Sequence, residues 1–479
     1  MPEDRALPLV VDLDGTLTRT DTLAEALFRL AREQPLALIH AAFTLRQGRA
    51  AFKARIARLT ALDPSTLPLN PELIAWLREQ AARGRSLILA TASDRQVAQV
   101  VADRVGLFTE VLASDGQRNL KGPAKAAVLV ERFGKGGFDY VGDSRADLPV
   151  WAAARHAIVV GGPRLVQSTS PIATVARVFT PPPRLPALWR ALRPHQWAKN
   201  LLVFLPLLAA HQVSDPRGLF AAGLAFLAFS LTASAVYLVN DLLDLDADRH
   251  HPSKCRRPFA TGELPLAWGA LLSPLLLLTA IGLNLWFLPP LFTLILVGYF
   301  LVTTTYSFGL KRKPVVDVLL LAALYTLRVI AGAAAVAIVP SFWLLAFSMF
   351  IFLSLALAKR YTELDGLRRR GELTAAGRAW HVDDLPLVQT LGTGAGLAAV
   401  LVLALYIDSA PARQLYASPQ VLWLVCPLLL YWISRLWFKA HRGEMDEDPV
   451  VFALGDRVSL VLGSSAAGII LLAILGLPQ

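Results

Sequence analysis

Residues that can bind a metal ion and a polyphosphate are concentrated between Asn240 and Gly262, a stretch that reads N-D-L-L-D-L-D-A-D-R-H-H-P-S-K-C-R-R-P-F-A-T-G. A long apolar segment ends here. If its helix continues, Asn240, Asp244 and Asp248 lie on one face, about 6 Å apart along the axis, with Asp241 beside them. Because Mg²⁺ is usually shared between a few carboxylates, water and substrate phosphates, this spacing predicts a polyphosphate partner.

Basic residues follow these carboxylates within one loop. Lys254, Arg256 and Arg257 can bind the phosphate oxygens that the metal does not coordinate. Carboxylates at a helix end repel one another unless a cation or partner lies between them, so we favour a substrate site over a solvated loop that caps a membrane helix. His250 and His251 do not indicate zinc, because no cysteine or spaced third ligand accompanies them.

The N-terminal part of the chain contains a second acidic motif. The apolar run that starts at Leu9 ends in D-L-D-G-T, which places Asp12 and Asp14 on either side of one residue. A strand followed by a tight turn brings both carboxylates to the carboxyl end of a parallel sheet, where open α/β folds bind ligands. Lys125, which opens an amphipathic helix, offers a cation near the same edge.

Two more expected strands end in polar turns. The run Ser86 to Ala90 is followed by Thr91 and further hydroxyl groups that can hold a phosphate. The run Phe138 to Val141 is followed by G-D-S-R-A-D, which supplies Asp143 and Asp147 for a metal. The order of these features predicts one site at the edge of one sheet.

The composition predicts a soluble domain followed by a membrane domain. The 479 residues are 55% hydrophobic with a mean hydropathy of +0.49, which is too apolar for a wholly soluble protein. We divide the chain into a domain at 1–180, a Pro-rich linker at 181–192 and a membrane domain at 193–479. The net charge of +11 fits positive loops and anionic lipid, and no nucleic-acid motif appears. The two cysteines exclude a disulfide framework.

Nine apolar segments of the second domain predict an all-α membrane domain. They lie at about 199–212, 218–240, 265–283, 290–308, 315–337, 342–358, 387–407, 420–438 and 458–476. The loops after the second, fourth, sixth and eighth segments carry runs of Lys and Arg, so we expect them on the cytoplasmic side. The N-terminus lacks the apolar core of a signal peptide, so the first domain should lie on that same side of the bacterial plasma membrane.

Further polar residues should lie at or near the cytoplasmic ends of these segments. Arg328 is expected about three turns inside its segment, where an unpaired charge is costly, so it serves function or is paired. Lys199 either extends to the membrane interface or contacts substrate. The candidate substrate-binding residues of this domain are Lys199, Asn200, Lys254, Arg256, Arg257, Lys311, Arg312, Arg328, Lys359, Arg360, Tyr361 and Glu363.

The first domain resembles the haloacid dehalogenase-like (HAD-like) phosphatase family over most of its length. The resemblance implies a Rossmann-like α/β fold, with a small helical cap between Asp21 and about Leu77. It also implies an aspartyl-phosphate mechanism with Asp12 as nucleophile and Asp14 as general acid and base. Lys121 competes with Lys125 for the lysine role, and we favour Lys125 because it heads a helix. The remaining implied roles are phosphate binding by Thr91 and Lys125, and Mg²⁺ binding by Asp12, Asp14, Asp143 and Asp147. The alternative is a degenerate domain that binds phosphate or merely folds.

The second domain resembles the UbiA-type superfamily of membrane transferases through N-D-x-x-D-x-x-x-D. It is most similar to the decaprenyl-phosphate phosphoribosyltransferases, through R-P-H-Q-W-A-K-N, G-L-K, L-R-V-I-A-G, A-K-R-Y-T-E-L and the final D-R-V. Prenyl-transferring members usually carry a second aspartate-rich motif, where this chain reads K-R-Y-T-E-L-D. The resemblance therefore implies Mg²⁺, a phosphoribosyl diphosphate donor and a polyprenyl phosphate acceptor, with Asp244 and Asp248 at the catalytic centre.

Two alternatives stay open. A prenyltransferase that joins an allylic diphosphate to an aromatic acceptor would be favoured by a second aspartate-rich motif. A transporter or scaffold would be favoured by ionisable residues along a path through the bilayer or by an inverted repeat. The fusion and the complete phosphatase motifs suggest the hypothesis that the first domain removes the 5-phosphate of the transfer product. It could instead hydrolyse pyrophosphate or an unrelated phosphate ester. The sequence leaves open the prenyl chain length and whether the chain forms a homo-oligomer.

Overall fold

The chain divides into two compact units, which this computed structural model describes over residues 7–60, 63–115, 117–374, 379–445 and 448–476. The first unit contains Met1–Leu192 and Tyr237–Pro274, and the second contains Arg193–Val236 and Leu275–Gln479. The acidic stretch that follows Asn240 therefore packs with the N-terminal domain. The first residues, on which the expected lack of a signal peptide partly rests, lie outside the described ranges.

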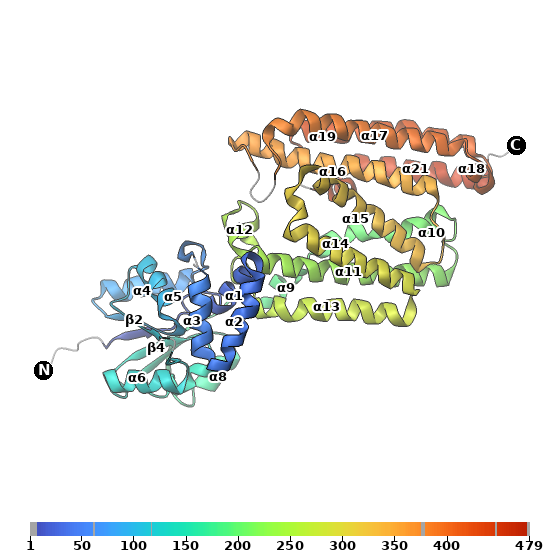
Figure 1. Cartoon of the computed structure of the whole chain (residues 1–479). Coiled ribbons are helices and arrows are strands. Elements are labelled where there is room, and N and C mark those ends of the chain that lie inside the picture. Colours follow the sequence, from blue (N-terminus) through green and yellow to red (C-terminus); the bar gives the residue numbers. More distant parts are fainter. Residues whose placement is uncertain (1–6, 61–62, 116, 375–378, 446–447, 477–479) are drawn as a thin grey trace. The chain divides into compact units, whose positions relative to one another are not determined.

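A six-stranded parallel sheet forms the centre of the N-terminal part (Figure 1). Its order is β3-β2-β1-β4-β5-β6, so the chain builds outward from β1 first on one side and then on the other. In open sheets of this kind, ligands bind beyond the carboxyl ends of the strands where the order reverses, which is here at β1. The strands are β1 (Leu9–Val11), β2 (Leu87–Asp94), β3 (Glu110–Ser114), β4 (Asp139–Gly142), β5 (His156–Val160) and β6 (Thr174–Phe179).

Both faces of this sheet are covered by helices. Because side chains alternate along a strand, Leu9 and Val11 enter one hydrophobic core while Val10 enters the other. Helices α4 (Pro71–Ala82) and α5 (Arg95–Val105) lie on one face, and α6 (Pro123–Phe133) lies on the other (Figure 1). Burial on both faces explains why the strands read as continuous apolar runs. The predicted α/β fold is confirmed.

A small helical group lies between the first two strands, where the sequence predicts a cap. It consists of α1 (Thr22–Glu33), α2 (Pro35–Ala42) and α3 (Arg49–Leu59). Its own core contains Ala26, Leu30, Ala41 and Ile56. We call these three helices the cap.

The first unit also includes the segment that returns at Tyr237, which we call the aspartate loop (residues 237–274). It begins with the end of α11 (Pro216–Leu243) and continues through α12 (Leu245–His250) and the 3-10 helix η5 (Lys254–Arg256). It ends with the first two turns of α13 (Leu266–Phe287). The stretch at 181–192, expected to be a linker, contains helix α9 (Arg184–Leu192).

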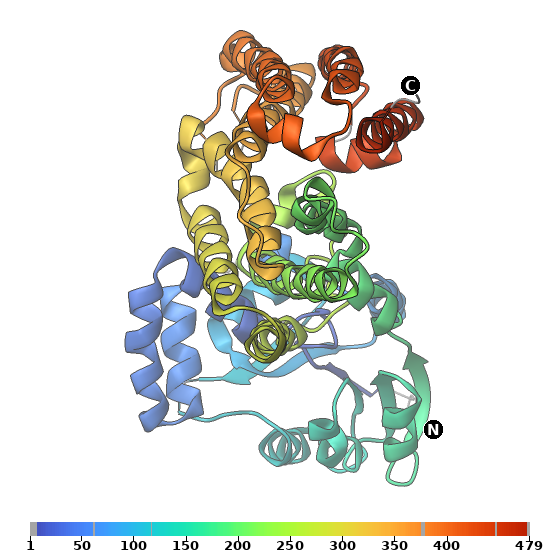
Figure 2. The ribbon, with the colours of Figure 1, turned by 90° about the vertical axis from the view of Figure 1, so that its right-hand side faces the viewer.

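Long helices dominate the second unit, and they run roughly parallel to one another when viewed nearly end-on (Figure 2). Within the described ranges, eight helical segments of the chain are long and apolar enough to cross a membrane. They are Pro216–Leu243 (α11), Leu266–Phe287 (α13), Pro290–Phe308 (α14), Pro314–Ala335 (α15), Phe342–Arg370 (α16), Val382–Ile407 (including α17, Leu385–Ile407), Pro419–Arg442 (including α19, Val425–Arg442) and Arg457–Leu475 (α21). An integral membrane domain is thereby confirmed.

The structure corrects the first expected span, at 199–212. The chain there forms the 3-10 helix η4 (Pro194–Phe204) and the short helix α10 (Leu205–Ala209), and it turns at His211 with a φ of +57°. No single helix reaches spanning length, so the expected nine spans become eight among the described residues. Helix η4 packs closely on α15. The approach is so close that a Cβ at Gly332 of α15 would clash with the backbone of Val203 in η4.

Candidate active sites

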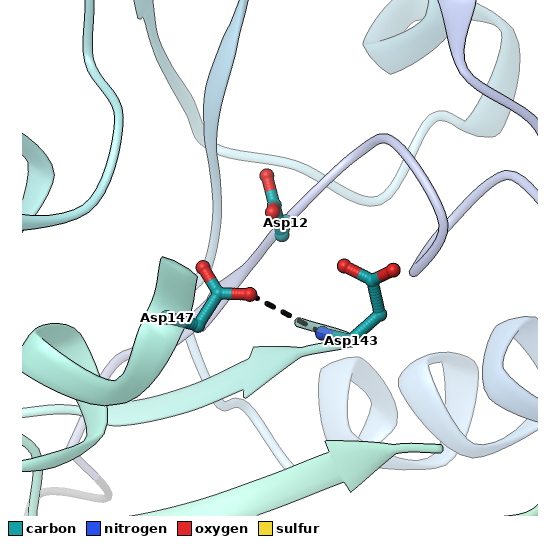
Figure 3. Close-up of side chains that lie close together, drawn as sticks. All are labelled: Asp12, Asp143 and Asp147. Carbon is teal, nitrogen blue, oxygen red and sulfur yellow. Dashed lines mark hydrogen bonds between the residues drawn. The ribbon is translucent and has the colours of Figure 1, made fainter. Parts of the chain in front are cut away.

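Three carboxylates of the first unit meet at the carboxyl ends of β1 and β4. Asp12 directly follows β1, Asp143 directly follows β4, and Asp147 ends the 3-10 helix η3 (Arg145–Asp147). Since β1 and β4 pair, with Val11 opposite Val141, the two turns lie side by side. One ligand oxygen of each residue lies within 4.8 Å of the others. Figure 3 shows the three side chains close together. The geometry brings together three of the four metal-binding residues that the sequence predicts here.

A buried lysine joins this group. The Lys125 ammonium lies 2.9 Å from Asp12 Oδ1 and 3.7 Å from Asp147 Oδ1. It donates to the hydroxyl oxygen of Tyr140 at 2.8 Å, and that hydroxyl donates to Asp147 at 2.9 Å. Lys121, the alternative, is exposed. The structure therefore places Lys125, at the start of α6, beside the expected nucleophile.

Asp14 is held apart from the metal-binding group by hydrogen bonds. The backbone N–H of Thr22, at the start of the cap, donates to Asp14 Oδ1 at 2.8 Å, and the Ser93 hydroxyl donates to Oδ2. The side chain of Thr91 is buried and accepts from the backbone N–H of Ser93 at 3.0 Å. A carboxylate fixed in this way, next to the nucleophile's strand, can exchange a proton with a leaving group.

The charge of the acidic group is only partly balanced. Burial raises the pKa of Asp143 to about 8, and the nearby Asp12 and Asp147 add to the rise. Burial also raises the pKa of Asp12 to about 6, although Lys125 opposes the rise. Three close carboxylates with one ammonium fit a divalent cation, which Asp12, Asp143 and Asp147 would hold. Gly15 permits this closeness, because a Cβ at its φ of +74° would clash with the Asp143 carboxylate.

Lys53 is a candidate that the sequence analysis missed. It lies on α3 of the cap, and its ammonium donates to the Ala92 carbonyl at 2.8 Å, directly after Thr91. Burial lowers its pKa, while the nearby Asp14 opposes the shift. The only sequence signal is a lysine within the expected cap, which does not distinguish it from other basic residues there.

The aspartate loop differs from the expected continuous helix. Helix α11 ends at Leu243, and Asp244 caps α12 with non-helical backbone angles of −100° and 14°. Two backbone hydrogen bonds still join residues four apart, as in an α-helix. The Asp244 N–H donates to the Asn240 carbonyl at 2.9 Å, and the Asp248 N–H donates to the Asp244 carbonyl at 2.8 Å. The residues thus stay close in space although the helix breaks.

Arginine side chains engage the carboxylates of this loop. The Arg257 guanidinium lies 3.0 Å from Asp241 Oδ1 and 2.6 Å from Asp248 Oδ2. Asp244 pairs at 3.0 Å with Arg32 of the cap. Burial raises the pKa of Asp248 to about 6, with Arg257 opposing the rise. Among the described residues, the Asp12 group is the only set of three or more Asp, Glu, His or Cys side chains with metal-like spacing.

A buried ion pair links the cap to the aspartate loop within the first unit. Arg249 of α12 donates to both carboxylate oxygens of Glu25 in α1, at 2.9 and 2.6 Å, and both side chains are buried. The Thr20 hydroxyl donates to the same carboxylate at 2.7 Å, and Arg249 Nε donates to the Ala260 carbonyl at 3.0 Å. This arrangement connects the turn after β1 to the residue next to Asp248.

In the second unit, Arg328 is buried among uncharged groups. Its guanidinium donates to Asn200 Oδ1 at 2.9 Å and to the Tyr299 hydroxyl at 3.0 Å. It also lies over the rings of Tyr299, at 4.9 Å, and Tyr325, at 5.6 Å. No carboxylate among the described residues pairs with it. A buried cation with neutral partners attracts an anion such as a phosphate.

Two lysines of the second unit share one carboxylate. Asp448, which caps α20 (Pro449–Gly455), forms ion pairs with Lys199 and, at 3.7 Å, with Lys359. The sequence analysis did not select Asp448. The sequence shows Asp448 only as one acidic residue of a charged loop. Its two partners are far away in the sequence, so the sequence does not indicate the pairing.

Arg360 belongs to a separate buried network. It pairs at 2.9 Å with Asp317 and also with Glu363. Asp317 accepts further hydrogen bonds from the Tyr306 hydroxyl and the Trp380 indole, each at 2.7 Å. The remaining predicted residues lie elsewhere: Tyr361 bonds to His441 at 2.9 Å, and Lys311 and Arg312 are in the 3-10 helix η6 (Leu310–Arg312).

Comparisons with known proteins find two families, each matching a different part of the chain. The UbiA prenyltransferase family matches residues 201–474, and the haloacid dehalogenase-like hydrolase family matches residues 9–151. The chain therefore belongs to the UbiA prenyltransferase family and carries a HAD-like domain in its N-terminal part.

Three proteins are similar to this chain over much of their own length. A Sinorhizobium fredii protein, y4nM, is 36% identical over 98% of this chain and 92% of its own length. The Azorhizobium caulinodans nodulation protein NoeC is 39% identical over 57% of this chain and 88% of its own. Decaprenyl-phosphate phosphoribosyltransferase of Mycobacterium tuberculosis is 34% identical over 60% of this chain and 93% of its own. The first of these similarities extends over both domains.

Proposed function

We propose that the chain transfers a 5-phosphoribosyl group from phosphoribosyl diphosphate to a polyprenyl phosphate, and that its HAD-like domain then removes the 5-phosphate. The buried Arg328, surrounded by neutral partners, carries the first half of the proposal, because it offers a phosphate-binding charge within an apolar domain. The similarity to decaprenyl-phosphate phosphoribosyltransferase supports the choice of substrates.

The transfer step forms one bond and breaks one. A phosphate oxygen of the lipid attacks C1 of the ribose while the bond from C1 to the diphosphate breaks, and pyrophosphate leaves. The acceptor is already anionic at pH 7, so the enzyme must orient it more than deprotonate it. Mg²⁺, held by Asn240, Asp241, Asp244 and Asp248, would neutralise the departing diphosphate. Arg257 would then be released from Asp248 to bind phosphate oxygens.

Cations of the second unit would serve the other phosphate groups. We assign phosphate binding to Arg328, which has neutral partners, and to Lys199 and Lys359, which share the single carboxylate of Asp448. Arg360 is already paired with Asp317 and Glu363, so it would support the fold around this region.

The HAD-like step would use the residues at the β1 and β4 ends. An Asp12 oxygen attacks the phosphorus of the 5-phosphate, the bond to the ribose oxygen breaks, and Asp14 gives that oxygen a proton. Water then attacks the aspartyl phosphate, Asp14 takes its proton, and phosphate leaves. Lys125 orients the nucleophile, and Mg²⁺ held by Asp12, Asp143 and Asp147 would lower the repulsion between nucleophile and phosphate.

One experiment tests both steps with the purified full-length chain in detergent. Phosphoribosyl diphosphate carrying ¹⁴C in the ribose and ³²P in the 5-phosphate is incubated with polyprenyl phosphate and Mg²⁺. We expect ¹⁴C in the lipid fraction and ³²P as free phosphate. An allylic prenyl diphosphate with an aromatic acceptor serves as the competing substrate pair. Turnover of that pair alone would show that the chain is a prenyltransferase.

The cytoplasmic orientation is part of the proposal, and the basic loops support it. It can be checked with Cys255, which is half-buried in the aspartate loop. We expect a membrane-impermeant thiol reagent to label Cys255 in inverted vesicles and not in intact cells.

A further inference from the structure

A large cavity of the first unit opens over the HAD-like site. Its volume is about 890 Å³, which is within the range of pockets that hold whole organic ligands and is much more than inorganic phosphate needs. Asp14 and Asp143 lie on one wall. Gly262, Glu263 and the first residues of α13 lie on another wall, so the aspartate loop forms part of the opening.

The cavity has a group of arginines that the phosphatase chemistry does not use. Arg145, Arg164 and Arg184 all line it, from η3, α8 (Pro163–Thr169) and α9. None of the three has an ion-pair partner in the described part of the chain. Arg19 also lines the cavity, and so do the acidic residues Asp14, Asp21, Glu72, Asp143 and Glu263, of which Glu263 is paired with Arg190. The arginines are therefore available to an anion.

The wall formed by α13 leads toward a lipid environment. Pro265, Leu266 and Ala267 line the cavity, and α13 is one of the candidate membrane spans. One turn further along the helix, Leu271 is exposed. An isoprenoid chain beside this face would bring its head group to the level of the cavity.

We infer that this cavity is a binding site for a lipid-linked phosphate, which makes the HAD-like domain a phosphatase for substrates carried by a polyprenyl chain. The terminal phosphate would lie at Asp12 and Asp14. A second phosphate, nearer the lipid, would be bound by Arg145, Arg164 and Arg184. The inference rests on the proposed function for the identity of the sugar, but the lipid-phosphate site can be tested without it.

The test measures hydrolysis of p-nitrophenyl phosphate by the full-length chain in detergent, with polyprenyl phosphate as inhibitor. We expect competitive inhibition by polyprenyl phosphate and none by polyprenol, which lacks the phosphate. The double variant Arg164→Gln/Arg184→Gln should raise the inhibition constant about tenfold. The variant Arg164→Lys/Arg184→Gln, which keeps a positive charge at residue 164, should bind polyprenyl phosphate more tightly than this double variant. Arg83→Gln, an exposed arginine outside the cavity, serves as the matched control.

The same variants are then tested with the lipid-linked ribose phosphate as substrate. We expect kcat/KM for this substrate, relative to p-nitrophenyl phosphate, to fall about tenfold in the double variant and to stay unchanged in Arg83→Gln. Absence of inhibition in the wild type, or equal inhibition of the wild type and the double variant, would overturn the inference. Inhibition without hydrolysis of the lipid-linked ribose phosphate would refute the proposed function and leave the lipid-phosphate site standing.

Discussion

Two acidic clusters of the first unit differ in what balances their charge. At the HAD-like site, three carboxylates share the single ammonium of Lys125. In the aspartate loop, Arg257 pairs with Asp241 and Asp248, and Arg32 pairs with Asp244. The first cluster is short of positive charge and can take up a cation directly. In the second, a cation must compete with arginine, so its binding can be coupled to a substrate that draws the arginine away.

The largest expected effect separates the two clusters by reaction. Asp12→Asn should lower the release of the 5-phosphate at least about 1,000-fold, because it removes the nucleophile, while transfer of ribose to lipid continues. Asp248→Asn should abolish transfer and leave hydrolysis of p-nitrophenyl phosphate intact. The double-labelled donor measures transfer and 5-phosphate release in Asp12→Asn, and p-nitrophenyl phosphate measures the phosphatase in Asp248→Asn, which forms no lipid product. Loss of transfer in Asp12→Asn, or loss of p-nitrophenyl phosphate hydrolysis in Asp248→Asn, would contradict the assignment of one reaction to each cluster.

The next effect concerns the buried link between the cap and the aspartate loop. Glu25→Gln should leave Arg249 buried without a carboxylate partner, which costs about 3 kcal/mol for a pair of this kind. Hydrogen exchange of the amides in α12 should therefore become about 100-fold faster. Glu131→Gln, an exposed glutamate on α6, is the control. Equal exchange in both variants would show that the link does not stabilise the loop.

A smaller effect is expected when the arginine of the second cluster is removed. Arg257→Gln leaves Asp241 and Asp248 facing each other, so we expect a loss of about 2 kcal/mol in EDTA. Mg²⁺ should recover much of this loss by taking the place of the guanidinium. Thermal unfolding of the full-length protein, with and without Mg²⁺, measures the difference. A variant that Mg²⁺ does not stabilise more than the wild type would argue against metal binding by this loop.

The last effect is a pH dependence of the first cluster. The pKa of Asp143 is raised from 3.8 to about 8 in the folded protein, so the folded state holds a proton that the unfolded state has released. Stability in EDTA should therefore fall as the pH rises from about 4 to 8. The gain in Tm on adding Mg²⁺ should grow over the same range, to about 5 °C. Asp143→Asn should flatten the profile, and an unchanged profile in this variant would contradict the prediction.

Local sequence signals were sufficient for the HAD-like site. The motifs D-L-D-G-T and G-D-S-R-A-D each follow a short apolar run, and parallel pairing of β1 with β4 brings their carboxylates together. The choice of Lys125 over Lys121 rested on its position at the head of a helix, where the structure has it beside Asp12. Such features depend on a few adjacent residues and on the regular geometry of a sheet.

Contacts between distant segments were beyond the reach of the sequence. The pairing of Lys199 with Asp448 joins residues far apart in the chain, and the break of α11 before Asp244 follows no proline or glycine. Lys53 reaches the Ala92 carbonyl only because the cap folds over the end of β2. The segment at 199–212 is apolar enough for a span, but its backbone follows a 3-10 helix instead. Packing with other segments decides each of these features.

The discontinuous first unit has a consequence for biosynthesis. Glu25 is translated with the N-terminal domain, whereas Arg249 emerges only after α11, a candidate membrane span. Insertion of α11 alone would carry Arg249 to the opposite side of the membrane from Glu25. The ion pair can therefore form only if the broken helical segment before α11, η4 with α10, crosses the membrane as well. An inverted α11 would leave the cap without its partner. The Glu25–Arg249 pair is thus a contact of the folded first unit that depends on the membrane topology of the newly made chain.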